Sequence, residues 1–156
     1  MILYYSRGNK TKTFAEVLGK VLQKDVYKLE TSLDKKGDFT FILKALYLTF
    51  SNKSETIINM PKSIPNEIYI CTPIWGGKIA APIRFFLANA QLKDTVVNLL
   101  LTANIPLDKY KEEALNELNK TPCRPGNAYI FATSDKIPPE PDIIDEQLRL
   151  LLNIKL

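Results

Sequence analysis

Short strand-like runs alternate with helical segments along the whole of this 156-residue chain. Five runs are either continuously apolar or alternate apolar with polar residues over strand length, at residues 1–5, 25–30, 67–72, 95–102 and 128–133. Helical spacing of apolar residues separates them, as at Phe14, Val17, Leu18, Val21 and Leu22. This alternation predicts an α/β fold with a doubly wound, five-stranded parallel sheet and helices on both faces.

Length and composition limit the classes of protein that fit. A chain with 46% hydrophobic residues and this length predicts one core, and therefore a single domain over residues 1–156. The chain begins directly on a strand-like run, without a basic segment followed by a small-residue cleavage site. Its most apolar stretch, residues 39–50, is too short to cross a bilayer and contains Lys44. We therefore expect a cytoplasmic protein with no membrane span.

The side chains available for chemistry are few. The chain has no histidine, which excludes histidine-dependent triads and the commonest general base, and leaves catalysis to a cofactor or to carboxylates. Cys71 and Cys123 lie far apart without a C-x-x-C spacing, so we expect idle, buried thiols and no metal site or disulfide. The formal charge of +4 comes from scattered lysines, which predicts a solvated surface and no nucleic-acid partner.

Prolines and polar residues suggest where elements begin and end. Pro73 is expected to stop the third strand, and Pro82 fits the first turn of a helix. Residues 122–126 have turn composition, and Asp142 is expected to cap the last helix. Residues 39–50 are apolar nearly all round and predict a well-buried helix with Asp38 as its N-cap; exposed instead, the same surface would be a homodimer contact.

Two unusual loops follow the first and third strands. In a sheet of order 2-1-3-4-5 these strands flank the point where the order reverses, and ligands bind beyond the carboxyl ends of the strands there. The first loop contains Ser6, Arg7, Gly8, Asn9, Lys10 and Thr11, and the second contains Pro73, Ile74, Trp75, Gly76 and Gly77. Their coincidence with this point predicts one binding site made of both loops.

The residue types in the two loops suit different parts of a ligand. Hydroxyls of Ser6 and Thr11, with N–H groups at a helix start, can bind phosphate oxygens, and Arg7 or Lys10 can add charge. A solvated loop is the alternative. Trp75 follows a buried strand and precedes two glycines, which presents its indole for stacking on a planar ring; a core tryptophan is the alternative.

The chain resembles the flavodoxin family in both loops. The family's phosphate loop reads S/T-x-T-G-N-T, and this chain has Ser6 and Thr11 at matching positions with Gly-Asn-Lys between them in place of Thr-Gly-Asn. The run T-P-I-W-G-G-K from Thr72 resembles the flavin-side loop of relatives with T-P-x-W followed by glycine. A third family loop matches Thr102, Ala103 and Asn104, which lack the usual glycines and aromatic residue. The resemblance implies FMN as cofactor.

Three functions are compatible with these motifs. The first is an FMN-binding electron-transfer protein that passes electrons to a redox partner protein or a small-molecule acceptor. The second is an NAD(P)H-dependent flavin or quinone reductase of the same fold, although the glycines form no G-x-G-x-x-G motif. The third is a flavin-free binding or regulatory domain, which the altered 6–11 loop favours.

Overall fold

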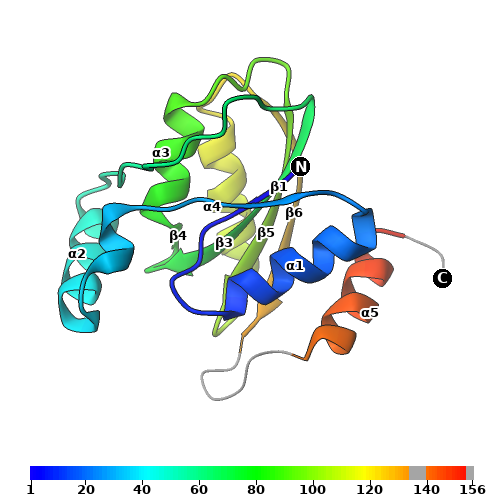
Figure 1. The fold of residues 1–156 in the computed structure, drawn as a ribbon, viewed down its shortest axis with the longest axis horizontal. Helices are drawn as coiled ribbons and strands as arrows, with labels where there is room; N and C mark the ends of the chain where they lie inside the picture. The colour runs from blue at the N-terminus through cyan, green and yellow to red at the C-terminus, as the bar shows by residue number, and fades with distance from the viewer. Residues whose placement is uncertain (134–139, 154–156) are drawn as a thin grey trace.

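The computed structural model describes residues 1–133 and 140–153. Five parallel strands pair in the order β2-β1-β3-β5-β6, which confirms the predicted order 2-1-3-4-5 (Figure 1). A short sixth strand, β4, pairs antiparallel with β3 and was not predicted. The strands are β1 (Ile2–Tyr4), β2 (Val26–Lys28), β3 (Glu67–Trp75), β4 (Lys78–Ile79), β5 (Val96–Ala103) and β6 (Arg124–Ala132).

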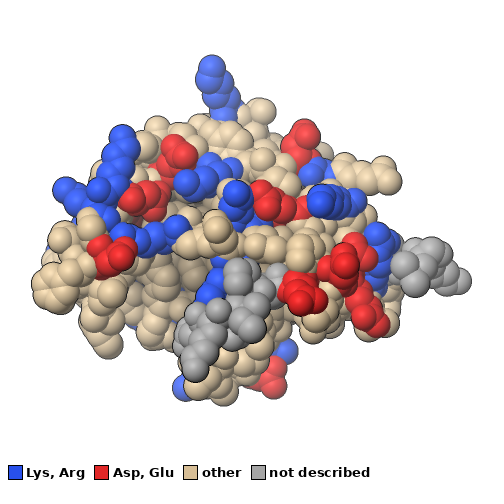
Figure 2. All heavy atoms as spheres, turned by 60° about the horizontal axis from the view of Figure 1, so that its bottom comes forward, with Lys and Arg blue, Asp and Glu red and all other residues tan. Residues whose placement is uncertain are grey.

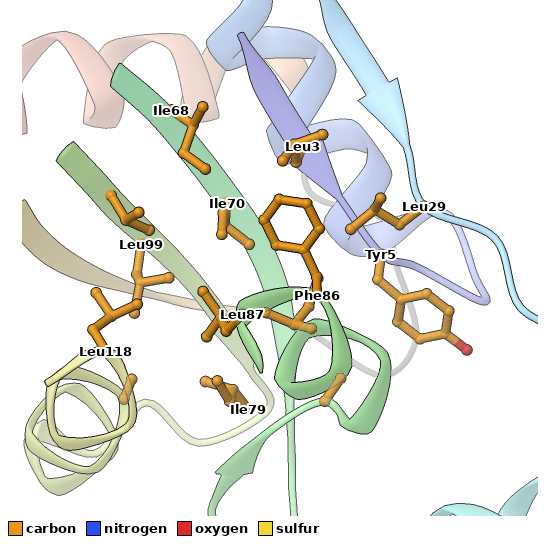
Figure 3. Close-up of a cluster of buried hydrophobic side chains, with 14 of the residues drawn as sticks. Leu3, Tyr5, Leu29, Ile68, Ile70, Ile79, Phe86, Leu87, Leu99 and Leu118 are labelled. Carbon is orange, nitrogen blue, oxygen red and sulfur yellow. The ribbon is translucent and has the colours of Figure 1, made fainter. Parts of the chain in front are cut away.

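Helices cover both faces of the sheet, as predicted. One face carries α1 (Lys10–Leu22) and α5 (Pro141–Leu151), and the other carries α3 (Ala81–Asn89) and α4 (Asp108–Leu118) (Figure 1). Alternate residues of one strand enter different cores, because Leu3 packs with the α3 and α4 side chains while Ile2 and Tyr4 pack with those of α1 and α5. Figure 3 shows the first of these cores between the sheet and α3. Burial on both faces explains why the central strands are continuously apolar.

Pro73 does not end the third strand, contrary to the prediction. The Tyr69 N–H donates to the Met1 carbonyl, and the Cys71 carbonyl accepts from the Tyr5 N–H, so odd-numbered residues of β3 face β1. The missing N–H of Pro73 therefore faces a side where β1 has already ended at Tyr4. The strand continues to Trp75, and Pro73 pairs with Thr102 of β5.

The predicted turn at residues 122–126 is also wrong beyond Cys123, because β6 begins at Arg124. The register between β5 and β6 shifts between Val97 and Leu99. At this bulge the Asn98 side chain accepts from the Asn127 N–H and occupies the space beside Gly126, where a Cβ would lie 2.3 Å from Asn98 Oδ1. Gly126, which suggests a turn in the sequence, is thus needed at the bulge between β5 and β6.

Two helix starts differ from the predictions by one or two residues. Gly37 is the N-cap of α2 (Asp38–Phe50), and Asp38 is its first helical residue. Glu140 is the N-cap of α5, with Pro141 at its first position, so Asp142 lies in the first turn and does not cap the helix. Pro82 lies in the first turn of α3, as predicted.

Helix α2 is not well buried. It follows a short 3-10 helix, η1 (Ser32–Lys35), and lies at the left edge of the molecule in Figure 1. Only one stripe, which consists of Phe41, Ala45, Leu48 and Thr49, is buried. This stripe packs against Leu33, Trp75 and Ala81, and the apolar residues on the opposite side of the helix stay exposed.

The burial of the two cysteines and the lengths of the helices agree with the expectations from the sequence. Cys71 and Cys123 are both buried and unpaired, and burial raises the pKa of the Cys71 thiol. Among residues 1–133 and 140–153, no helix has the length and apolarity that a bilayer span requires.

A buried arginine joins α2 to α3. Arg84 is 8% exposed and donates from Nη2 to the carbonyls of Leu48 (3.0 Å) and Lys53 (2.6 Å), and from Nη1 to Asn52 Oδ1 (3.0 Å). These acceptors lie at the carboxyl end of α2, where a cation also complements the helix dipole. Arg84 therefore fixes the position of α2.

We predict that Arg84→Lys lowers the free energy of unfolding by about 2–3 kcal/mol, because one ammonium group cannot reach the three acceptors of the guanidinium fork. The matched control is Arg124→Lys, an exposed arginine that bonds only the Asp94 carbonyl, with an expected loss below about 0.5 kcal/mol. Urea unfolding measures both variants. Equal losses would contradict the role of Arg84.

Candidate functional site

The carboxyl ends of β1, β3 and β5 surround a cleft of about 740 Å³. The predicted site residues come together here, although they lie on three loops far apart in the sequence. The lining contains Ser6, Arg7, Gly8, Asn9, Lys10, Thr11, Pro73, Ile74, Trp75, Gly76, Gly77, Thr102, Ala103 and Asn104. Parallel pairing of three strands places their carboxyl ends at one edge, which explains the convergence.

The start of α1 forms one end of the cleft. Asn9 is its N-cap, and its side chain makes no capping hydrogen bond within the described part of the chain. The first turn holds no acidic residue. Backbone N–H groups at such an end, together with the positive end of the helix dipole, favour an anion. A Cβ at Gly8 would meet nothing within 4 Å, so the loop is open beside this helix end.

The hydroxyls of this loop contact the protein itself. The Ser6 hydroxyl donates to the Gly8 carbonyl, and the hydroxyls of Thr11 and Thr102 share a buried hydrogen bond of 2.8 Å. The second bond joins the start of α1 to the end of β5 and holds two walls of the cleft together. Backbone N–H groups are therefore the main donors that this loop presents to an anion.

Arg7 lines the cleft but also reaches α2. Its Nη2 bonds Asp38 Oδ1 at 2.6 Å and the Lys36 carbonyl at 2.9 Å, and its guanidinium lies 4.0 Å from the centre of the Phe41 ring. Asp38 is 93% exposed, so this ion pair adds little stability. The second terminal nitrogen, Nη1, is buried without a hydrogen-bond partner among the described residues. The positive charge of Arg7 nevertheless lies at the cleft wall.

Trp75 also lines the cleft and is held by two aromatic rings. Tyr5 and Phe41 contact it edge-on, with ring centres 5.6 Å and 5.4 Å away and planes at 81° and 89°. The Tyr5 hydroxyl donates to Asp34, and burial, followed by the charge of Asp34, raises its pKa. Figure 3 shows this hydroxyl pointing out of the core. Trp75 thus packs against the core on one side and lines the cleft on the other. The sequence suggests either a core tryptophan or one presented to a ligand, and the structure combines the two.

The hairpin between β3 and β4 requires glycine. Gly76 and Gly77 have φ of +53° and +88°, a region that other residues rarely adopt. Trp75 pairs with Lys78 across this turn. The Ala80 N–H donates to the carbonyl of Pro73 and so closes the hairpin. Gly76 is exposed and Gly77 is partly exposed, and both line the cleft.

Four lining residues were missed by sequence reasoning: Phe41, Ile105, Tyr110 and Thr133. Tyr110 lies in the first turn of α4, and its Cε1 is 3.7 Å from the position of a Cβ on Gly77. It supplies, from the helix, the aromatic side chain that the loop of Thr102, Ala103 and Asn104 lacks. Thr133 donates to Asn104 Oδ1 at 3.3 Å and positions that loop. The sequence does contain a signal for Tyr110, because it is an aromatic residue in the first turn of the helix that follows this loop.

The described lining of the cleft is poor in the side chains that most often serve as general acids or bases. No aspartate, glutamate or cysteine is among its described lining residues, and the chain has no histidine. The described residues also contain no cluster of three or more potential metal ligands. This lining is suited to binding a planar, anionic ligand.

No family model and no curated protein matches the sequence. Solved structures with a similar fold are found, however. A candidate flavoprotein from Bacteroides uniformis aligns over 96% of both chains with a TM-score of 0.73 and 13% identity. A flavoprotein from Lactobacillus acidophilus, in complex with FMN, aligns over 83% of this chain and 90% of its own with a TM-score of 0.61 and 21% identity. A two-electron reduced flavodoxin from Megasphaera elsdenii aligns over 94% of this chain and 96% of its own, with a TM-score of 0.54 and 13% identity.

This chain has the flavodoxin-like fold. Its cleft lies at the edge of the sheet where the strand order reverses, between β1 and β3. Ligand sites of doubly wound sheets occur at this place for a geometric reason, because helices that leave toward opposite faces open a crevice between their loops.

We predict that Thr102→Val lowers the free energy of unfolding of the ligand-free protein by about 1–2 kcal/mol, because it leaves the buried Thr11 hydroxyl without its partner. The double variant Thr11→Val/Thr102→Val should lose less than the sum of the two single variants, since no unpaired hydroxyl remains. Urea unfolding of all four proteins measures the coupling. Additive losses would show that the two hydroxyls do not act as a pair.

Proposed function

We propose that this chain binds FMN in the cleft and acts as an electron-transfer protein. The observation that carries the proposal is that one cleft is lined both by a helix start without a side-chain cap and by aromatic side chains. FMN needs both kinds of partner, because it has a phosphate and a planar ring. The likeness in fold to a flavoprotein in complex with FMN supports the choice of cofactor.

The residues fit the two ends of FMN. The backbone N–H groups at the start of α1 would hold the phosphate, with Arg7 and Lys10 adding positive charge. Trp75 and Tyr110 would contact the ring from β3 and α4. Arg7 lines the cleft and has one terminal nitrogen, Nη2, on Asp38, so its charge is shared between an exposed carboxylate and the cleft.

The flavin would supply the electron chemistry, and the chain would supply position and field. Tyr5 and Phe41 fix the indole of Trp75, and the hydrogen bond between Thr11 and Thr102 fixes the phosphate end against the sheet. Figure 2 shows basic and acidic side chains interspersed on one face, so no field of one sign dominates there. The acceptor is a redox partner protein or a small molecule.

A neighbouring hollow supports an alternative function. It measures about 530 Å³ and adjoins the cleft at Gly76, Gly77 and Tyr110. Its other lining residues are Lys78, Lys109, Glu112, Glu113 and Asn116. A second ligand there would lie beside the ring end of the cleft, as an NAD(P)H-dependent flavin or quinone reductase requires. Steady-state NAD(P)H oxidation with a quinone acceptor separates this enzyme from an electron carrier, because only the enzyme turns over.

We predict that FMN raises the melting temperature of the protein and that riboflavin, which lacks the phosphate, raises it much less. At an FMN concentration one hundred times the Kd, binding adds about 2.7 kcal/mol to the free energy of unfolding. Differential scanning fluorimetry with both compounds measures the difference. No shift with FMN would contradict the proposed function, and equal shifts would contradict the phosphate site at α1.

We also predict opposite effects of Asn9→Asp on stability and on FMN binding. A carboxylate at the N-cap should stabilise the ligand-free protein by about 0.3–1 kcal/mol, because it complements the helix dipole. The same charge should repel the phosphate and weaken FMN binding roughly tenfold, while the affinity for riboflavin stays unchanged. Urea unfolding and titration calorimetry measure the two effects.

The matched control is Asn127→Asp, which adds the same charge at an exposed site toward the amino end of β6. This variant should bind FMN like the unmodified protein. If Asn9→Asp also leaves FMN affinity unchanged, the phosphate does not bind at the start of α1.

A further inference from the structure

Helix α2 has an outer face that is apolar and exposed. This outer α2 face consists of Phe39 (75% exposed), Ile42 (54%), Leu43 (52%), Leu46 (45%), Tyr47 (53%) and Phe50 (79%). In Figure 1 no other helix lies on its outer side. A helix that is apolar all round is normally covered by another surface.

The charged residues of α2 lie off this face or are already paired. Lys44 bonds Glu55 at 2.8 Å, and Asp38 bonds Arg7. A helix that lies on a membrane usually carries several lysines or arginines along its polar flank, and α2 has Lys44 alone. The chemistry of the outer α2 face therefore favours a protein partner over a lipid surface.

The helix is held firmly in this orientation. Its inner stripe packs around Phe41, Ala45 and Leu48, and Arg84 bonds its carboxyl end. The ion pair of Lys44 with the buried Glu55 adds a third anchor. Rotation of α2 to bury the outer face would break all three contacts, so the face can be covered only from outside.

The size of the outer α2 face matches one half of a stable interface. With about 200 Å² for each complete side chain, the exposed fractions give roughly 700 Å² of largely apolar surface. The largest exposed apolar patch of a monomeric protein is about 300–600 Å², and a standard interface buries about 800 Å² per partner. Two such faces, with some of their surroundings, reach the standard size.

The outer α2 face is also self-complementary. Its residues are placed symmetrically about the middle of the helix, so that two antiparallel copies would pair Phe39 with Phe50, Ile42 with Tyr47, and Leu43 with Leu46. Each pairing joins apolar side chains, and the antiparallel arrangement also opposes the two helix dipoles favourably. Two copies of a positively charged chain repel each other, so a charged interface would not favour their association. The interface between two outer α2 faces is formed by apolar side chains instead.

We propose that a second copy of this chain covers the outer α2 face, forming a twofold dimer in which the two α2 helices pack antiparallel. The proposal does not depend on FMN. The dimer would also support the cleft, because Phe41 and Asp38, which contact Trp75 and Arg7, belong to the same helix.

Sedimentation velocity over a hundredfold range of protein concentration tests the dimer. The unmodified protein should sediment as a dimer, and Phe39→Glu/Phe50→Glu should sediment as a monomer, with a dimer Kd raised at least a hundredfold. Leu150→Glu is the matched control, because Leu150 is 72% exposed on α5, and it should remain a dimer. Circular dichroism and urea unfolding establish that each variant is folded.

A second pair of variants tests the antiparallel pairing. Leu43→Glu/Leu46→Glu places like charges opposite each other in the dimer, whereas Leu43→Glu/Leu46→Lys places opposite charges there. The second variant should dimerise at least tenfold more tightly than the first, although both add two charges to the same helix. Equal Kd values would overturn the antiparallel packing.

Three results would overturn the proposal as a whole. The first is a monomer at every concentration, and the second is a dimer that survives Phe39→Glu/Phe50→Glu. The third is a monomer that sediments with phosphatidylcholine and phosphatidylglycerol vesicles, which would assign the outer α2 face to a membrane. Dissociation of Leu150→Glu would place the interface on α5 instead.

Discussion

Parallel pairing of β1, β3 and β5 is the constraint on which the rest of this structure depends. It places the ends of three strands, and therefore three loops, at one edge of the sheet. Continuation of β3 past Pro73 carries Trp75 beyond the end of β1 and into the cleft wall. Without that extension the indole would not reach the same cleft as the start of α1. The fold thus determines the place of the site and brings a helix start and an indole into one cleft.

The site combines rigid parts with donors that a ligand can use. Tyr5 and Phe41 hold Trp75, and the bond between Thr11 and Thr102 joins two walls. The hydroxyls of the first loop are used inside the protein, so in the proposed site backbone N–H groups would be the main donors to the anion. Anion binding by backbone groups depends on loop shape more than on side-chain identity, which explains how a loop with Gly-Asn-Lys in place of Thr-Gly-Asn remains compatible with a phosphate.

Much of the fold and of the cleft lining follows from local patterns, and the remainder depends on tertiary contacts. Apolar spacing predicts α1 and α3, and the two loops beside the reversal of strand order predict the cleft. The passage of β3 through Pro73 depends on where β1 ends, which no local pattern contains. The apolar composition of α2 predicts burial, yet Arg84 and η1 place the helix at an edge where one side stays exposed. Arg7 contacts Asp38, 31 positions away, and Tyr110 enters the cleft from a helix.

Because Trp75 is the only tryptophan of the chain, its fluorescence reports on the cleft directly. The central claim is that one ligand contacts the start of α1 and the indole at the same time. Titration of FMN into the protein, followed by Trp75 emission, tests it most directly. The account predicts saturable quenching at one FMN per chain, reversed when excess inorganic phosphate competes for the helix end. Emission that FMN does not change, beyond the absorbance of the flavin itself, would contradict the account.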